Sequence, residues 1–109
     1  MKQLTQHQCL SAESALSKAF GLLGKRWNGL IVAVLAPGPA GFADLRRRIG
    51  PISDSVLSDR LSELAEAGIV ERCVTDARPP GVQYGLTRAG QALVPILEQV
   101  ADWAADHLG

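Results

Sequence analysis

The polar side chains best suited to binding chemistry are concentrated in residues 41–67 of this chain. Arginines come first, and hydroxyl and carboxylate side chains follow: Arg46, Arg47, Arg48, Ser53, Asp54, Ser55, Ser58, Asp59 and Arg60. Guanidinium groups bind phosphate oxygens, whereas hydroxyls and carboxylates can hydrogen-bond the edges of bases. Small side chains also let a helix backbone approach a partner closely, so we interpret this stretch as a candidate surface for binding DNA.

Two short helices joined by a tight turn are predicted to position these groups. Leu45 and Ile49 lie four residues apart, which places both side chains on one face of the first helix. Pro51 lacks a backbone donor and disfavours the helical conformation of Gly50, so the first helix ends there. A helix, a turn and a second helix is the arrangement found in major-groove readers.

The second helix is predicted to begin after Ser53 and to end before Gly68. The hydroxyl of Ser53 can accept a hydrogen bond from a free backbone amide in the first turn, and Gly68 can adopt the left-handed conformation that stops a helix. Between these two residues an apolar stripe repeats at helical spacing, formed by Leu57, Leu61 and Leu64. The small polar side chains fall on the far side of the same helix.

An ordinary amphipathic helix pair with a solvated run of charges is the alternative interpretation of this segment. A helix cannot aim three consecutive side chains at one partner, so we expect one or two of the three arginines to reach a phosphate. Arg60 is expected to form an ion pair or to touch a phosphate rather than to read a base.

Further helices and a hairpin surround this pair. Helices are predicted over residues 11–23, capped by Ser11, and over 25–35, strands over 69–75 and 82–86, and a final helix after Thr87. This order is that of a winged helix-turn-helix domain, an α+β fold that is mostly α, with an N-terminal helix and a long C-terminal dimerisation helix. Residues 70–86 form the wing, and Arg78 near its tip is expected to enter or flank the minor groove.

The final helix carries more apolar surface than a small domain can cover by itself. Its stripe, widened by an indole ring, consists of Leu93, Leu97, Val100, Trp103, Ala104 and Leu108. Burial against a second copy would be favourable by about 25 cal/mol per Å² of apolar surface. We therefore expect a twofold homodimer, which would also place two reading helices about one helical turn of DNA apart.

Composition predicts a single globular domain over residues 1–109, with residues 1–10 as a flexible arm. Hydrophobic residues make up 47% of the chain and charged residues 20%, a balance that excludes a disordered protein. No apolar signal segment or membrane-spanning stretch is present, so we expect a cytoplasmic protein without a membrane partner. The formal net charge is zero, but all eleven Lys and Arg residues precede residue 89, which leaves a basic body and an acidic final helix.

Neither a catalytic site nor a metal site is indicated. No Cys-x-x-Cys pair and no His cluster accompany Cys9 or Cys73. The chain also lacks a defensible Ser/His/Asp arrangement and a glycine-rich phosphate loop after a strand. We therefore expect no enzymatic activity, no metal and no cofactor.

With these elements placed, the chain resembles the HxlR-type transcriptional regulators, a branch of the MarR-like winged helix superfamily. The resemblance covers nearly the whole chain. The matching stretches are Cys9, GKRW at 24–27, GFADLR at 41–46, ISDSVL at 52–57, RLSEL at 60–64, AGIVER at 67–72, RPPGVQYGLT at 78–87, Gly90 and Trp103. No single stretch is decisive, but their order and spacing together are specific.

The resemblance implies a homodimer paired through the first and last helices, which adds Leu16 and Phe20 to the predicted interface. It also implies that a cysteine near the N-terminus senses oxidants or electrophiles, and Cys9 occupies that position. Cys9 precedes the predicted Ser11 cap by two residues, where the helix dipole favours a thiolate. The alternative is a small apolar side chain that packs under the first helix. Cys73 matches no family cysteine, and we predict no role for it.

The sequence thus predicts a sequence-specific DNA-binding transcriptional regulator that acts as a homodimer. Residues 53–67 form the reading helix in the major groove, and residues 70–86 form the wing at the minor groove. The expected partners are a double-stranded DNA operator, a second copy of the chain, and an oxidant or small-molecule effector. The alternative is a winged helix that contacts only proteins, which zero net charge and acids on the reading helix would favour.

Overall fold

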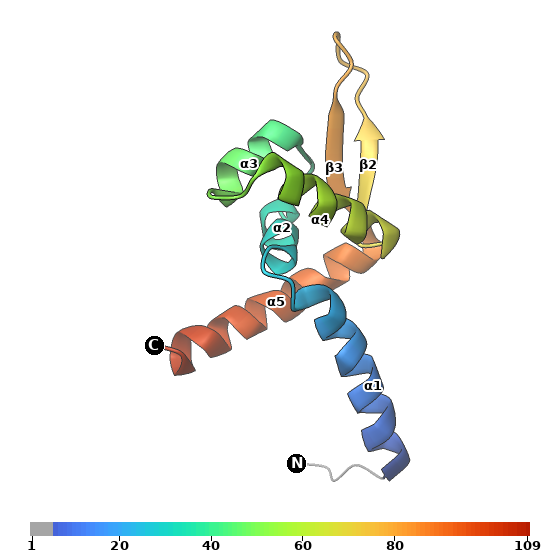
Figure 1. Ribbon diagram of the computed structural model, residues 1–109, viewed down its shortest axis with the longest axis vertical. Coiled ribbons are helices and arrows are strands. Elements are labelled where there is room, and N and C mark those ends of the chain that lie inside the picture. The colour runs from blue at the N-terminus through green and yellow to red at the C-terminus, as the bar shows by residue number, and fades with distance from the viewer. Residues whose placement is uncertain (1–5) are drawn as a thin grey trace.

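The computed structural model describes the backbone of residues 6–109 and the side chains of residues 12–109. Within this part of the chain the elements are α1 (Gln6–Leu23), α2 (Asn28–Leu35), β1 (Ala40–Gly41), α3 (Phe42–Ile49), α4 (Asp54–Glu66), β2 (Val70–Val74), β3 (Val82–Leu86) and α5 (Arg88–His107) (Figure 1). The helix-rich winged helix fold predicted from the sequence is confirmed.

Local signals set both ends of α4 and the start of α5 where the sequence predicted them. The Ser53 hydroxyl oxygen accepts a hydrogen bond from the Val56 amide at 3.2 Å and caps α4. Gly68 follows α4 with a φ of +76°, a left-handed conformation that glycine adopts without a steric cost. Thr87 caps α5 by accepting a hydrogen bond from the Gly90 amide at 3.2 Å.

The wing is the antiparallel hairpin of β2 and β3, in which Val70 lies opposite Leu86. β1 pairs with the other edge of β3, where Ala40 lies opposite Tyr84. The sequence did not predict β1, because an alanine and a glycine have low strand propensity and form a strand here only by pairing with β3.

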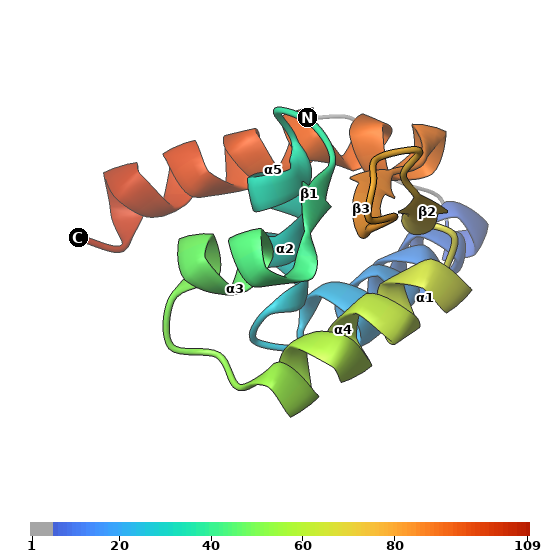
Figure 2. The ribbon, with the colours of Figure 1, turned by 90° about the horizontal axis from the view of Figure 1, so that it is seen from above.

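α2 forms the centre of the hydrophobic core. Ile31, Val32 and Leu35 are completely or almost completely buried. Apolar side chains of α3, α4 and the sheet complete the same cluster: Leu45, Ile52, Leu57, Leu61, Leu64, Val70 and Leu86. Figure 2 shows α4 and α5 on opposite sides of α2, so the face of α4 that lies away from this core remains at the surface.

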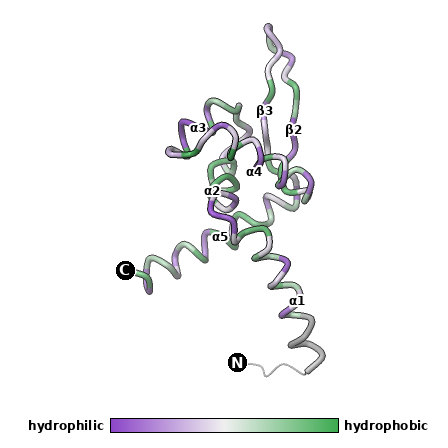
Figure 3. The backbone as a smooth tube through the Cα atoms, viewed as in Figure 1, coloured by the Kyte–Doolittle hydropathy of each residue, from purple (hydrophilic) through white to green (hydrophobic). Residues whose placement is uncertain are grey.

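α1 and the C-terminal half of α5 extend away from this body (Figure 1). The molecule accordingly measures 57 × 32 × 23 Å along its principal axes. Along α5, hydrophobic segments alternate with hydrophilic ones beyond the point where the helix leaves the body (Figure 3). Among the described helices, none combines the length and the apolar character needed to span a membrane.

The first helix starts earlier than the sequence predicted. α1 begins at Gln6, so Ser11 is not its N-cap and residues 6–10 are helical rather than part of an arm. The run before Ser11 contains no helix breaker, and a serine is tolerated inside a helix, so the capping signal alone misplaced the start. Residues 1–5 and the side chains of residues 6–11, including Cys9, lie outside the described part of the chain.

The second helix starts three residues later than predicted, at Asn28 instead of Lys25. The turn between α1 and α2 is held by two hydrogen bonds that local patterns do not reveal. Asn28 Nδ2 donates to the Leu22 carbonyl at 2.8 Å, and the Gly24 amide donates to the Phe20 carbonyl at 2.8 Å. This turn fixes the direction in which α1 leaves the body.

Gly90 lies where the start of α5 crosses the segment after α4, and a Cβ there would collide with the Ile69 carbonyl oxygen. Gly90→Ala is therefore expected to lower the free energy of unfolding by about 1–3 kcal/mol, the usual cost of overpacking. Urea denaturation measures this change. Gly21→Ala in α1 is the matched control, because nothing lies within 4 Å of the added Cβ, and it should not lower stability. Equal stability of Gly90→Ala and wild type would contradict the close contact.

Candidate nucleic-acid interface

The face of α4 opposite the core carries short polar side chains. Leu57, Leu61 and Leu64 point into the core. The opposite face exposes Ser55, Ser58, Asp59 and Ser62. The structure therefore brings together the hydroxyls and the carboxylate that the sequence assigned to the reading helix, and it leaves their hydrogen-bonding groups accessible.

An ion pair joins the N-terminus of α4 to α3. Asp54 Oδ1 lies 3.1 Å from Arg46 Nε, and both side chains are exposed. Ser53 uses its hydroxyl oxygen to cap the helix, so its hydroxyl hydrogen remains available to a partner. Exposed ion pairs contribute at most about 1 kcal/mol, so Arg46 can exchange Asp54 for a phosphate at little cost.

The other two arginines of α3 form ion pairs with Asp44. Arg47 and Arg48 both contact its carboxylate, and the Arg47 side chain is 78% exposed. A surface hollow of about 290 Å³ is lined by Ala43, Arg46, Arg47 and Gly50. Two guanidinium groups at one hollow with small neighbours are suited to an anion, and Arg48 is not part of that lining.

Arg60 lies apart from the exposed polar set. Its side chain is only 23% exposed, and Nη1 lies 3.0 Å from Glu63 Oε2. The same Glu63 oxygen accepts from Lys25 Nζ at 2.9 Å, which braces α4 against the turn before α2. The ion pair predicted for Arg60 is thus present, whereas Lys25 is a partner that sequence spacing could not reveal.

The wing presents Arg78 on the exposed loop between β2 and β3. Thr75 and Gly81 close this loop, because the Thr75 amide donates to the Gly81 carbonyl at 2.7 Å and Thr75 Oγ1 accepts from the Gly81 amide at 3.0 Å. Figure 1 shows the hairpin extending beyond α3 and α4. Arg72 in β2 is a further exposed basic residue that the sequence analysis did not single out.

The side chains predicted to form a dimer interface fall into two groups. The large exposed ones are Leu16, Phe20, Val100, Trp103 and Leu108. Leu93 and Leu97 instead pack against the core and are half-buried, as is Ala104. Leu30 and Ile96 are further exposed apolar side chains on α2 and α5. These exposed apolar side chains therefore lie on α1 and α5, which extend away from the body, and at Leu30 of α2.

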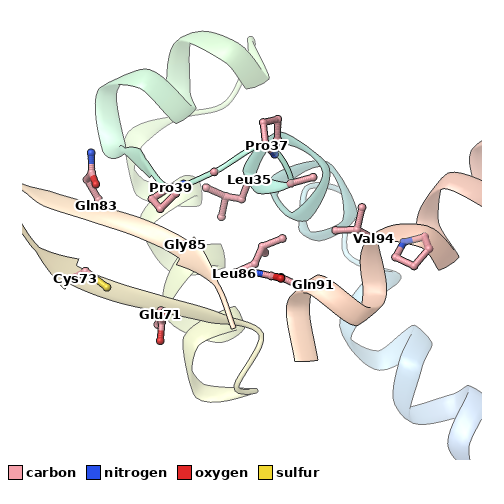
Figure 4. Close-up of a pocket in the computed structure, with 13 residues that line it drawn as sticks. Leu35, Pro37, Pro39, Glu71, Cys73, Gln83, Gly85, Leu86, Gln91 and Val94 are labelled. Atoms are coloured by element: carbon pink, nitrogen blue, oxygen red, sulfur yellow. The ribbon is translucent and has the colours of Figure 1, made fainter. Parts of the chain in front are cut away.

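A separate cavity of about 510 Å³ lies between the turn after α2, the wing strands and the start of α5 (Figure 4). It is lined by Leu35, Ala36, Pro37, Gly38, Pro39, Glu71, Cys73, Gln83, Gly85, Leu86, Gln91, Val94 and Pro95. Arg78 and the predicted DNA-binding residues of α3 and α4 are not among them, and neither are the residues predicted to contact a second copy. Cys73 is a free, exposed thiol on β2, three residues after the buried Val70.

Sequence comparison relates this chain to known regulators of transcription. A sequence model of the HxlR-like helix-turn-helix family matches residues 22–109. The HTH-type transcriptional regulator YodB of Bacillus subtilis is 45% identical over 89 residues, which cover 82% of this chain and 80% of YodB. The family and this relative are regulators, so the expectation that the chain is not an enzyme is confirmed.

Solved structures of YodB from B. subtilis have the same fold. The reduced form has a TM-score of 0.79 at 43% identity and covers 85% of this chain and 91% of that one. The quinone-bound form has a TM-score of 0.74 at 42% identity and covers 84% and 96%. Since the family match spans most of the chain and the fold is shared, this protein belongs to the HxlR-like helix-turn-helix family of transcriptional regulators.

Proposed function

We propose that this regulator binds a double-stranded DNA operator in a sequence-specific manner, as a homodimer. Residues 53–67 enter the major groove, and residues 70–86 contact the minor groove through the wing. The observation that carries this proposal is the exposed face of α4, where short hydroxyl and carboxylate side chains lie between flanking arginines.

Two kinds of contact follow from this arrangement. Arg46 and Arg47, at the hollow beside α3, and Arg78 on the wing supply positive charge on either side of α4. Their guanidinium groups bind phosphates and position the protein without reading sequence. The hydroxyls of Ser53, Ser55 and Ser58, at and near the start of α4, contact base edges and carry specificity.

A winged helix that contacts only proteins is the competing function, because the net charge is zero and acids lie among the arginines. These acids do not prevent DNA binding. Asp44 and Asp54 are accessible to solvent and form ion pairs with arginines, and a phosphate can replace the carboxylate in such pairs. Binding to duplex DNA at low and moderate salt separates the two functions.

Arg47→Gln should weaken binding to every duplex alike and lower the salt dependence of the binding constant by about one unit, because one phosphate contact is lost. Ser58→Ala should instead reduce discrimination at one base pair. Fluorescence anisotropy with operator and scrambled duplexes at several salt concentrations measures both effects. Lys18→Gln on α1 removes the same charge away from α4 and is the control. If no duplex binds even at low salt, the protein-contact function is favoured.

The homodimer is supported by the exposed apolar side chains of α1 and α5. Several large apolar side chains exposed on a small protein mark an interaction site, and a second copy offers a self-complementary partner. Val100 and Trp103 occupy the middle of the α5 face, where they are 54% and 55% exposed. Substitutions at these positions therefore test the interface without opening the core.

Val100→Glu should convert the dimer to a folded monomer, because a carboxylate would be buried without a partner at the interface. Analytical ultracentrifugation at micromolar concentration measures the change, and operator binding should be lost with it. Ala105→Glu places the same charge on the exposed opposite face of α5 and should leave the dimer intact. A wild-type protein that sediments as a monomer would refute the proposal.

Cys9 is the proposed regulatory thiol. The similarity to YodB, whose structures include a reduced and a quinone-bound form, supports control by oxidants or electrophiles. Because α1 begins at Gln6, Cys9 is the fourth residue of the helix rather than a residue before its cap, and it still lies near the N-terminus, where the dipole favours a thiolate. A modification there would change how α1 pairs with a partner and so alter the spacing of the two reading helices.

Diamide or a quinone should release the operator from wild-type protein but not from Cys9→Ser. Cys73→Ser is the matched control, because Cys73 is the other cysteine of the chain and is exposed on the wing. Electrophoretic mobility shift before and after treatment measures release. Release of Cys9→Ser to the same extent as wild type would assign the effect to another group.

A further inference from the structure

We infer that Asp59 makes operator binding depend on a cytosine, within a C·G base pair, in each half-site. This inference rests on the proposed function, in which α4 enters the major groove. It adds the identity of the base that one side chain selects.

Asp59 lies opposite the buried stripe of α4. At 3.6 residues per turn it is rotated by about 200° from Leu57, which is fully buried. Its exposed neighbours on this face, Ser55 and Ser62, have shorter side chains, so the carboxylate extends further from the helix. In a groove this carboxylate would be among the first groups to meet the base edges.

Three of the other acids on or beside α4 differ from Asp59 because they have ion-pair partners. Asp54 pairs with Arg46, Asp44 pairs with two arginines of α3, and Glu63 accepts from Lys25 and Arg60. In the described part of the chain Asp59 forms no ion pair, and neither does Glu66, which lies two turns further on at the C-terminal end of α4. The charge of Asp59 is therefore available to a ligand, whereas the charges of the three paired acids are already balanced.

A carboxylate accepts hydrogen bonds and cannot donate them, which limits what it can bind in DNA. In the major groove the donors are the N4 amine of cytosine and the N6 amine of adenine, and adenine places the N7 acceptor beside its amine. Guanine and thymine present acceptor atoms. Because phosphates repel a carboxylate, it favours binding only where a base offers a donor, and cytosine fits this requirement best.

Selection of bound duplexes from a randomised library, with wild type, Asp59→Asn and Asp54→Asn, tests the inference. Asparagine has the shape of aspartate but also donates, which suits N6 and N7 of adenine. Wild type should enrich a C·G pair at one position in each half-site, and Asp59→Asn should replace it with an A·T pair. On defined duplexes the preference should change by about 5- to 150-fold. Asp54→Asn, which frees Arg46, should change the affinity for all duplexes by one factor.

Two other outcomes would overturn the inference in distinguishable ways. If Asp59→Asn bound every duplex more tightly and kept the same preferred base, Asp59 would act only by repelling phosphates, and the proposed function would stand. If wild type enriched no sequence, the proposed function itself would fail. Asp59 is exposed, so the substitution spares the core, and circular dichroism verifies that each variant is folded.

Discussion

Burial of the apolar stripe of α4 is the constraint on which the rest of this surface depends. Leu57, Leu61 and Leu64 lose almost all contact with water in the core that Ile31 and Leu35 of α2 also form. Burying each leucine contributes about 1.5–3 kcal/mol. The rotation of α4 about its own axis is therefore fixed, because turning the helix would expose leucines and force polar groups into the core. The composition of the outward face follows from that rotation.

A second constraint links α4, the wing and α5 at one residue. Thr87 Oγ1 donates to the Gly68 carbonyl at 2.6 Å and accepts from the Gly90 amide, while the Thr87 amide donates to the Ile69 carbonyl at 3.0 Å. One side chain thus satisfies backbone groups at the end of α4 and at the start of α5. A displacement of α5 is therefore coupled mechanically to the reading helix and to the first residue of the wing.

The ion pairs around α4 differ in how easily they can be exchanged. The pair between Arg46 and Asp54 is exposed, so water screens it and a phosphate can replace the carboxylate. Arg60 and Glu63 are mostly buried, and removing either partner would leave a poorly solvated charge. Burial therefore separates the arginines that are available to a ligand from Arg60, whose charge is already paired within α4, although all belong to the same short segment.

Local sequence specified both ends of α4, the start of α5 and the buried face of α4, because caps such as Ser53 and Thr87 and the spacing of leucines act within a few residues. The same local signal failed at Ser11, because a good capping residue shows only where a helix can begin. Pairing between Lys25 and Glu63, which are 38 residues apart, depended on the tertiary structure. So did the strand at β1 and the cavity beside Cys73. Each of these arises only when distant segments pack together, and no periodicity or capping preference encodes the distance between such segments.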